Sequence, residues 1–394
     1  MIFLMVSNKN LEIELQELLR QKNYPQIVLE ITTKTEEKTR SSSLSNLLGI
    51  CRITNNKNNK DIVTLAIRDF KHGFLVEKNT PPAIDSLANF IISSVLLYDL
   101  EGNNEFSFEE IINFYKETEK LTNYHRAIHV AMTMVYRRLN NFEGMIFHYN
   151  KIIKSKNFVD IDLVNYGYWR CFDKNWRQED FLKFGKFLDE NLKIYPKENL
   201  INFSENKNLK TKIGFLSSDI RGGHSITYFL KTVLSNYDKK KFEIILFLNN
   251  PKEDKKTEDF KNLVDNSFNI SHLDNLSVLN KARDLKIDIM IDLMGYTSQP
   301  RIELFKNRMA KIQVIWLGYC NTSGLKNMDY IISDPNLIMP EEQKLYAEKV
   351  IYLPQIWNCH SGFDFKRNQN PPPLKKNNYF TFGSFNNFDK INQM

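Results

Sequence analysis

The sequence predicts an all-α helical array followed by a doubly wound α/β lobe. From Leu11 to about Glu198 the apolar residues recur at helical spacing, and turn residues interrupt them at short intervals. Beyond Lys212 they form short continuous runs that alternate with helical segments, a pattern typical of a parallel sheet covered on both faces. A chain of 394 residues can hold two or three domains. We place the first two at 1–205 and 206–375.

The helices expected in the first part share an apolar stripe and end at polar turns. They cover residues 11–20, 24–31, 46–51, 88–97, 108–115, 126–139, 142–153, 163–171 and 176–192. Two aromatic pairs, Phe142 with Trp176 and Phe147 with Phe181, are each 34 residues apart, which is the tetratricopeptide period. We therefore expect a short, irregular tetratricopeptide-like solenoid whose groove binds a peptide or protein. An unrelated helical bundle is the alternative.

The strands expected in the second part are short apolar runs with turn residues at their ends. They cover Ile213–Ser217, Phe242–Leu248, Ile287–Leu293, Ile312–Leu317, Tyr330–Ser333 and Val350–Leu353. Helical segments separate most of them, at Ile226–Leu234, Val278–Leu285 and Arg301–Lys306. In such sheets ligands collect outside the carboxyl ends of the strands. The loops that follow the strands are therefore the expected place for a site.

Three of these loops are polar and contain glycine. They are Ser217–His224, Asp292–Thr297 and Gly318–Gly324. Glycine lets the backbone turn sharply and approach a partner, and a helix that starts after the loop offers free N–H groups to an anion or hydroxyl. We predict that the three loops line a binding cleft. The alternative is structural: Asp219 or His224 could cap the next helix, and Asp292 could hold its loop through backbone N–H groups.

Composition and motifs disfavour several other classes of protein. Neither GxGxxG nor GxxxxGK[ST] occurs, so a dinucleotide or nucleotide-hydrolase site has no support. The four cysteines are too far apart to suggest a metal site or a disulfide scaffold. The net charge of +7 is small for this length and is not clustered, so we expect no nucleic-acid partner. The first residues lack a signal-peptide pattern and no apolar run approaches a membrane span, so we expect a cytoplasmic protein without a membrane partner.

Five blocks of sequence resemble, in the same order, the O-GlcNAc transferase/SPINDLY-type protein glycosyltransferases. They are KIGFLSSDIRGGHSITYFL, DIMIDLMGYTSQPRIELF, IQVIWLGYCNTSGLKNMDYIISD, YAEKVIYLP and FGSFNNFDKI. The resemblance implies a GT-B fold, in which two Rossmann-like lobes face each other behind tetratricopeptide repeats. It also implies inverting, metal-independent transfer of GlcNAc from UDP-GlcNAc to serine or threonine of a protein acceptor bound by the repeats, with no cofactor beyond the sugar nucleotide.

The resemblance also implies roles for individual residues. Asp219 and His224 match an Asp-Phe-x-x-His block in the cleft floor, and they would be catalytic together with Lys390, which would offset charge on the leaving diphosphate. The implied substrate-binding residues are Gly295, Tyr296, Thr297, Gly318, Tyr319, Thr322, Ser323, Gly324 and Asn387. This chain departs from the family at Ile220, which replaces the Phe, and His224 lies one residue further along than in the block. It also has Cys320-Asn321 in place of the family's Pro-Gly.

Residues 376–394 resemble the start of the second, nucleotide-sugar-binding lobe, with a strand expected at Tyr379–Phe385. Such a lobe needs on the order of 100–150 residues, and the resemblance places most donor-binding residues in it. We therefore expect a truncated enzyme that is incomplete as a single chain. Two alternatives remain: a tetratricopeptide scaffold with a decayed, non-catalytic lobe, or an O-fucosyltransferase that uses GDP-fucose. The oligomeric state is open.

Overall fold

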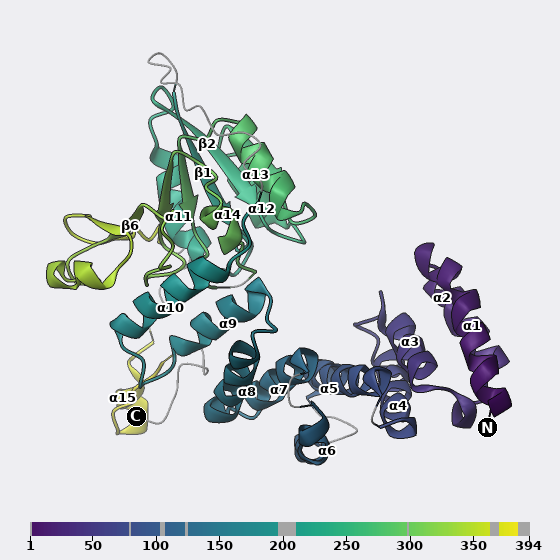
Figure 1. Ribbon diagram of the computed structural model, residues 1–394. Coiled ribbons are helices and arrows are strands. Elements are labelled where there is room, and N and C mark those ends of the chain that lie inside the picture. The colour runs from purple at the N-terminus through teal and green to yellow at the C-terminus, as the bar shows by residue number, and fades with distance from the viewer. Residues whose placement is uncertain are drawn as a thin grey trace. The chain divides into compact units, whose positions relative to one another are not determined.

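The computed structural model describes residues 2–78, 80–102, 107–122, 125–195, 210–297, 299–362 and 370–384. By its internal contacts the chain divides into two compact units, Met1–Asp162 and Leu163–Met394. The first unit consists of helices, and the second contains a sheet with helices around it (Figure 1). The domain boundary expected at 205–206 lies outside the described residues.

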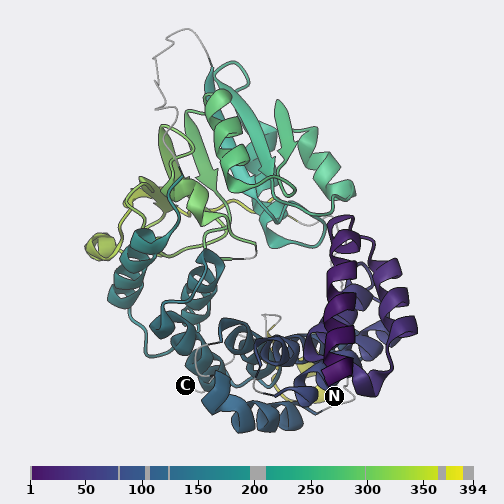
Figure 2. The same ribbon diagram turned by 45° about the vertical axis from the view of Figure 1, so that its right-hand side comes forward.

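The helices of the first unit follow one another in chain order along the array (Figures 1 and 2). They are α1 (Ile2–Arg20), α2 (Tyr24–Lys34), the 3₁₀ helix η1 (Glu37–Thr39), α3 (Ser42–Ile53), α4 (Lys60–Val76), α5 (Pro81–Glu101), α6 (Phe108–Thr122), α7 (Arg126–Arg138), α8 (Phe142–Ser155) and the start of α9 (Asp160–Arg170). The expected helices are confirmed, but α4, which directly follows a polar stretch, was not expected. The Asn59 side chain caps α4 by accepting the N–H groups of Asp61 and Ile62.

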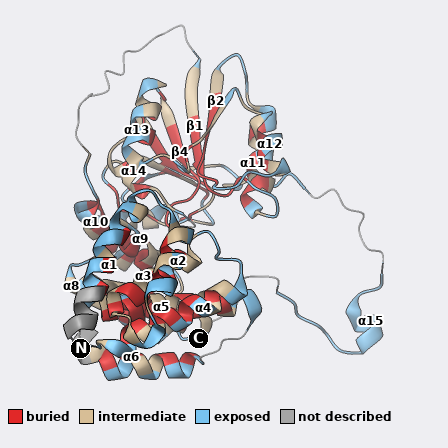
Figure 3. Cartoon of the chain, turned by 90° about the vertical axis from the view of Figure 1, so that its right-hand side faces the viewer, coloured by how far each residue is buried: buried red, intermediate tan, exposed pale blue. Residues whose placement is uncertain are grey.

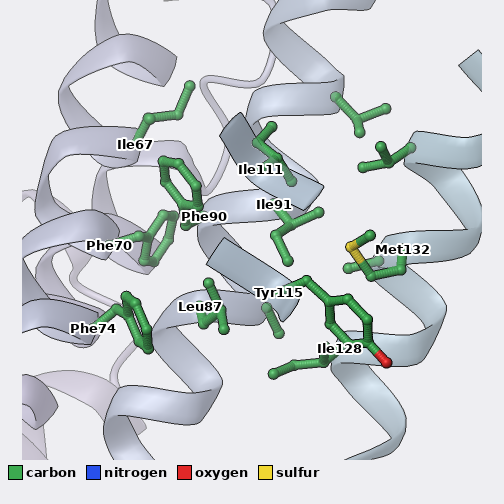
Figure 4. Close-up of a cluster of buried hydrophobic side chains, with 14 of the residues drawn as sticks. Ile67, Phe70, Phe74, Leu87, Phe90, Ile91, Ile111, Tyr115, Ile128 and Met132 are labelled. Carbon is green, nitrogen blue, oxygen red and sulfur yellow. The ribbon is translucent and has the colours of Figure 1, made fainter. Parts of the chain in front are cut away.

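Helix α5 lies in the main hydrophobic core of the first unit. Figure 4 shows Leu87, Phe90 and Ile91 of α5 between Phe70 of α4 and Met132 of α7, and each of the five is at most 2% exposed. Among the described residues, α5 is the one helix long and apolar enough to cross a membrane, and 56% of its most apolar window is buried. The expectation that no apolar run approaches a membrane span is therefore wrong, because α5 is apolar where it packs against its neighbours.

The second unit is built on a seven-stranded sheet in the order β3-β2-β1-β4-β5-β6-β7. All the neighbouring strands run parallel. The strands are β1 (Thr211–Ser217), β2 (Phe242–Leu248), β3 (Asn266–Asn269), β4 (Ile289–Asp292), β5 (Ile312–Ile315), β6 (Tyr330–Ser333) and β7 (Lys349–Tyr352). Six of them are the expected strands. The edge strand β3 was not expected, because Phe268 is its single apolar residue.

Helices cover both faces of this sheet. They are α11 (Ser225–Asn236), α12 (Lys255–Lys261), α13 (Asn275–Asp284) and α14 (Ile302–Lys306), with the 3₁₀ helix η2 (Pro340–Leu345) before β7. Phe215 of β1 and Leu246 of β2 share one core with Ile226 of α11. The next residues along these strands, Leu216 and Phe247, point to the opposite face and are also fully buried. Figure 3 shows this burial along the strands, which explains their nearly continuous apolar sequence.

Helix α10 (Gln178–Asn191) packs against the loops of the α/β sheet. A Cβ added to Gly185 would lie 2.6 Å from the Cα of Gly324. Lys306 of α14 forms an ion pair of 2.9 Å with the buried Asp189 of α10. The end of the helical region therefore belongs to the second compact unit, although the sequence changes its periodicity only after α10.

The strand expected at Tyr379–Phe385 does not form over its described residues. After the short helix α15 (Pro373–Asn377) the chain is irregular as far as Ser384, and Phe380 and Phe382 are 68% and 89% exposed. The expectation is wrong for these residues because a strand needs a neighbour to complete its hydrogen bonds. No described strand pairs with them, and Phe385 lies outside the described residues.

Candidate functional site

The order of the strands locates the candidate site. Strands β1 and β4 are neighbours in the centre of the sheet, and the connection from β1 leads to β2 on one side while that from β4 leads to β5 on the other. The loops at this point diverge and leave a crevice outside the carboxyl ends of the strands, where ligands bind in open parallel sheets. The loops predicted from the sequence follow β1, β4 and β5, so all three lie at this edge.

Asp219 and His224 come together in the loop after β1. The Nε2 atom of His224 lies 3.6 Å from Oδ1 of Asp219, and Nη2 of Arg221 lies 3.7 Å from the same oxygen. The Asp219 residue is 3% exposed, whereas the side chain of His224 is 32% exposed. The pair is therefore a buried carboxylate that faces an imidazole at the surface of the loop.

The capping role of His224 determines which ring nitrogen carries the proton. His224 is the N-cap of α11, and its Nδ1 accepts a hydrogen bond of 3.4 Å from the backbone N–H of Ile226. An imidazole nitrogen that accepts has no hydrogen, so the neutral ring carries its proton on Nε2, the atom that faces Asp219. The structural and functional interpretations of His224 are thus compatible, since one nitrogen caps the helix and the other faces the carboxylate.

Two glycines accommodate the one residue by which the spacing from Asp219 to His224 exceeds that of the family's block. Gly223 has φ +75°, a conformation that favours glycine. The N–H of Gly222 donates a hydrogen bond of 2.7 Å to Oδ2 of Asp254, the N-cap of α12. This bond holds the loop after β1 against the loop after β2, and it lowers the pKa of Asp254. The longer spacing therefore still brings the imidazole to the carboxylate.

Ile220, which replaces the family's Phe, has a structural position. Its side chain is fully buried in the core beneath α11. Its carbonyl accepts hydrogen bonds from Nδ2 of Asn250 at 2.9 Å and from Oγ1 of Thr257 at 2.8 Å. The substitution thus lies in the core behind the loop, while Asp219 and His224 face each other in front of it.

Asp292 organises the loop after β4. Its two carboxylate oxygens accept the backbone N–H groups of Met294 at 2.9 Å and Gly295 at 3.1 Å, as the structural interpretation predicted. Asp292 is 2% exposed, and burial raises its pKa to about 6, against the opposing effect of these two hydrogen bonds. The same loop bends back on itself, because the hydroxyl of Thr297 donates a hydrogen bond of 2.6 Å to the Met294 carbonyl.

The loops after β4 and β5 interlock. The rings of Tyr296 and Tyr319 are 4.8 Å apart, and the Tyr296 hydroxyl donates a hydrogen bond of 2.7 Å to the Ser323 carbonyl. A Cβ added to Gly295 would lie 2.3 Å from Cβ of Tyr319, and one added to Gly318 would lie 1.8 Å from the Leu293 carbonyl oxygen. Only glycine fits at these two positions, so close packing of the two loops accounts for both of them.

Thr322, Ser323 and Gly324 are buried and face the protein interior. The hydroxyl of Thr322 donates a hydrogen bond of 2.7 Å to Glu348, and the N–H of Ser323 donates one of 2.8 Å to the same carboxylate. Glu348 is 1% exposed, and burial raises its pKa. Gly324 has φ +70° and packs against Gly185 of α10. These three residues shape the third loop from behind, and a direct role in substrate binding stays a prediction.

An open pocket of about 340 Å³ lies beside the third loop. Its lining consists of Tyr168, Cys171, Gln178, Gly318, Tyr319, Cys320, Asn321 and Tyr346. The Tyr319 hydroxyl is buried and has no hydrogen-bond partner of suitable geometry among the described residues. It lies close to the thiol of Cys171. The lining consists of aromatic rings, carboxamides, thiols and one glycine, with no Asp, Glu, Lys or Arg side chain among its residues.

Several residues of this edge were not found from the sequence. Asp254 and Gln178 lie far from the three loops in the chain, and the sequence around them contains no motif that marks them. Glu348 lies within the block YAEKVIYLP, but nothing in that block indicates its contact with the third loop. Asn387 and Lys390, which the resemblance assigns to the donor's side of the cleft, lie outside the described residues. In the described part of the chain, no three His, Cys, Asp or Glu side chains are placed to hold a metal ion.

Comparison with known proteins agrees with this geometry. Residues 173–363 match the family model described as Glycosyl transferase family 41. This stretch of the chain is therefore similar to glycosyltransferase family 41. The matched region spans α10, the whole described sheet and the three loops of the candidate site.

Curated proteins with sequence similarity carry related names. A probable UDP-N-acetylglucosamine–peptide N-acetylglucosaminyltransferase SPINDLY of Oryza sativa subsp. japonica is 31% identical over 245 residues, which cover 59% of this chain and 26% of that protein. A UDP-N-acetylglucosamine–peptide N-acetylglucosaminyltransferase of Caenorhabditis elegans is 31% identical over 159 residues, which cover 39% of this chain and 14% of that protein. The chain thus spans about a quarter or less of the length of these relatives.

Among solved structures, an O-GlcNAc transferase mutant of Thermobaculum terrenum has a similar fold. The match has a TM-score of 0.62 with 18% sequence identity, and it covers 80% of this chain and 59% of that one. At this identity the match shows a shared fold. It confirms the expected fold class, a helical array followed by a Rossmann-like α/β lobe.

Proposed function

We propose that this chain provides the helical array and the first α/β lobe of a protein O-glycosyltransferase. The completed enzyme transfers GlcNAc from UDP-GlcNAc to a serine or threonine hydroxyl of a protein acceptor, with inversion, without a metal or other cofactor, in the cytoplasm. The observation that carries the proposal is the Asp219–His224 pair at the point where the strand order reverses, inside the region similar to glycosyltransferase family 41. The names of the relatives support GlcNAc as the sugar.

The pair fits the proton transfer that this reaction needs. The acceptor oxygen attacks the anomeric carbon of the donor, and the bond from that carbon to the diphosphate oxygen breaks, so the diphosphate leaves with the electron pair. The acceptor proton has to leave at the same time. A carboxylate next to an imidazole can take it up, and Arg221 lies 3.7 Å from the Asp219 carboxylate.

The two interlocked loops give this chemistry a rigid wall. The buried contacts among Gly295, Tyr296 and Tyr319 leave little room for the loops to move apart, and a site held in one geometry loses less free energy when a substrate is ordered. The uncharged pocket beside Tyr319 suits a sugar or a hydroxyl-bearing side chain better than a phosphate group. The proposal therefore places the diphosphate on a second lobe.

Calorimetric titration with UDP-GlcNAc tests whether binding of the donor requires a second lobe. Residues 1–394 alone should show no measurable binding and no transfer, whereas a chain that also carries a second GT-B lobe should show both. Tight binding of UDP-GlcNAc by residues 1–394 would contradict the proposal. The same titration with GDP-fucose separates the sugars, since binding of GDP-fucose in place of UDP-GlcNAc would support an O-fucosyltransferase. If the longer chain binds neither nucleotide, the scaffold interpretation is favoured.

A further inference from the structure

A buried histidine pair joins two helices of the first unit. The Nδ1 atoms of His129 in α7 and His148 in α8 are 2.9 Å apart, and each residue is 1% exposed. A contact of this length between two ring nitrogens is a hydrogen bond, in which one ring donates and the other accepts. A proton taken up by the accepting nitrogen replaces this bond with repulsion. A proton taken up by Nε2 of the donor ring keeps the bond but leaves a positive charge buried between the helices.

Aromatic rings surround the pair. Tyr115 of α6 lies edge-on to His148 with ring centroids 4.9 Å apart, and to His129 at 6.1 Å. Tyr136 of α7 stacks on His148 at 5.4 Å, and the neighbouring Phe147 contacts it edge-on at 5.2 Å. The two imidazoles thus belong to an aromatic cluster that holds α6, α7 and α8 together, where a charge has little solvation.

The charged groups around the cluster do not favour a positive charge on His148. Glu119 of α6 accepts a hydrogen bond of 3.4 Å from Tyr115. Lys151 of α8 is a cation and lies over the Phe147 ring. Three further carboxylates form ion pairs near the ends of α7: Asp85 with His125, Asp99 with Arg138 and Asp162 with Arg126. Burial, followed by the effects of His129 and Lys151, lowers the pKa of His148 to about 3.

We propose that the His129–His148 pair is an acid-sensitive latch in the helical array. At neutral pH its single hydrogen bond joins α7 to α8. Acidification protonates the pair and opens the packing of α6, α7 and α8. Helices α3, α4 and α5 stay closed, because the histidine there, His72, contacts the Ser45 hydroxyl and not a second histidine. The pair takes a proton and not a metal ion, because no third His, Cys, Asp or Glu ligand is placed beside it in the described residues.

Hydrogen exchange of the whole chain near pH 7.5 and about pH 5 tests the latch, with rates corrected for the intrinsic pH dependence of exchange. Below the ordinary histidine pKa of about 6.5, each pH unit should raise the open fraction of α6–α8 up to tenfold. Peptides from α3–α5 serve as the internal reference. His148→Gln, which stays neutral, should reduce this extra opening because only His129 remains to take up a proton, whereas the matched variant His360→Gln at an exposed site should retain it in full.

The proposal is overturned if the protection of α6–α8, measured relative to that of α3–α5, is the same at both pH values. This result depends on the native chain alone, so the test remains decisive if His148→Gln does not fold. Acid opening of the same size in a folded His148→Gln variant would also overturn it. A rise in the melting temperature on addition of Zn²⁺, lost in His148→Gln, would show that the pair binds a metal and would contradict the assignment of a proton.

Discussion

The hydroxyl of Tyr296 donates a hydrogen bond of 2.7 Å to the backbone carbonyl of Ser323, which joins the loops after β4 and β5. Tyr296 is 2% exposed and Ser323 is 1% exposed, so no water can replace this bond. Through it the cleft loops form one unit, which is anchored to Glu348 on one side and to α10 on the other. The rigidity of this wall is a property of the folded chain alone and can be measured without substrate.

Tyr296→Phe should destabilise the second unit, because it leaves the Ser323 carbonyl buried without a partner. We expect a loss of about 1–3 kcal/mol in the free energy of unfolding by urea. Tyr352→Phe is the matched control, since its hydroxyl makes an exposed bond of 3.4 Å to the Met339 carbonyl and should change the stability by less than about 0.5 kcal/mol. Equal effects of both substitutions would show that the two loops are not coupled by Tyr296.

Gly185→Ala should disturb the packing of α10 against the third loop. The added Cβ would lie 2.6 Å from the Cα of Gly324 and 2.7 Å from the Ser323 carbonyl oxygen, and backbone atoms cannot move aside as a flexible side chain can. Overpacking of this kind typically costs about 1–3 kcal/mol. The melting temperature of the second unit provides the measurement. Gly383→Ala, with no atom within 4 Å of the added Cβ, should leave it unchanged.

Asp292 should make the stability of the second unit depend on pH. Its folded pKa of about 6 is above the ordinary value of 3.8, so between these values the folded chain binds a proton that the unfolded chain does not. Its contribution to stability is therefore fully present below about pH 4 and declines as the pH rises through about 6, by at most about 1.4 kcal/mol per unit.

The variant Asp292→Asn isolates this contribution. The difference in free energy of unfolding between the native chain and Asp292→Asn should fall as the pH rises from about 4 to about 6, and then level off. Urea denaturation at several pH values measures it. A difference that stays constant over this range would mean that Asp292 keeps an ordinary pKa, and that its two hydrogen bonds to Met294 and Gly295 outweigh burial.

Much of this fold follows from local patterns in the sequence. Strands such as Phe242–Leu248 are predicted because burial on both faces makes them nearly all apolar. Strand β3 has no such signal, because it pairs at the edge of the sheet and exposes its polar side chains. Helix α4 begins in a polar stretch in which the Asn59 cap looks like one more loop residue. The 34-residue repeat predicts the helices, although Phe147 is 46% exposed and its counterpart Phe181 is 9% exposed.

The candidate site is predicted only in part, because its contacts join distant parts of the chain. The motif places Asp219 and His224 in one loop, and the structure brings them together. The sequence does not show that Glu348 holds Thr322 and Ser323 from behind, since only the fold places a residue before β7 next to the loop after β5. Buried roles for these two hydroxyls therefore become visible only in three dimensions.

Transfer of GlcNAc by a chain that also carries a second GT-B lobe tests the central role of the Asp219–His224 pair. UDP-GlcNAc and an acceptor protein are incubated with the native chain and with His224→Asn, which keeps a side-chain acceptor for the Ile226 N–H, and the added sugar is measured by mass spectrometry. The pair predicts a loss of about 10²–10⁴ in rate for the variant, without loss of stability. Transfer at the native rate by a folded His224→Asn variant would contradict it.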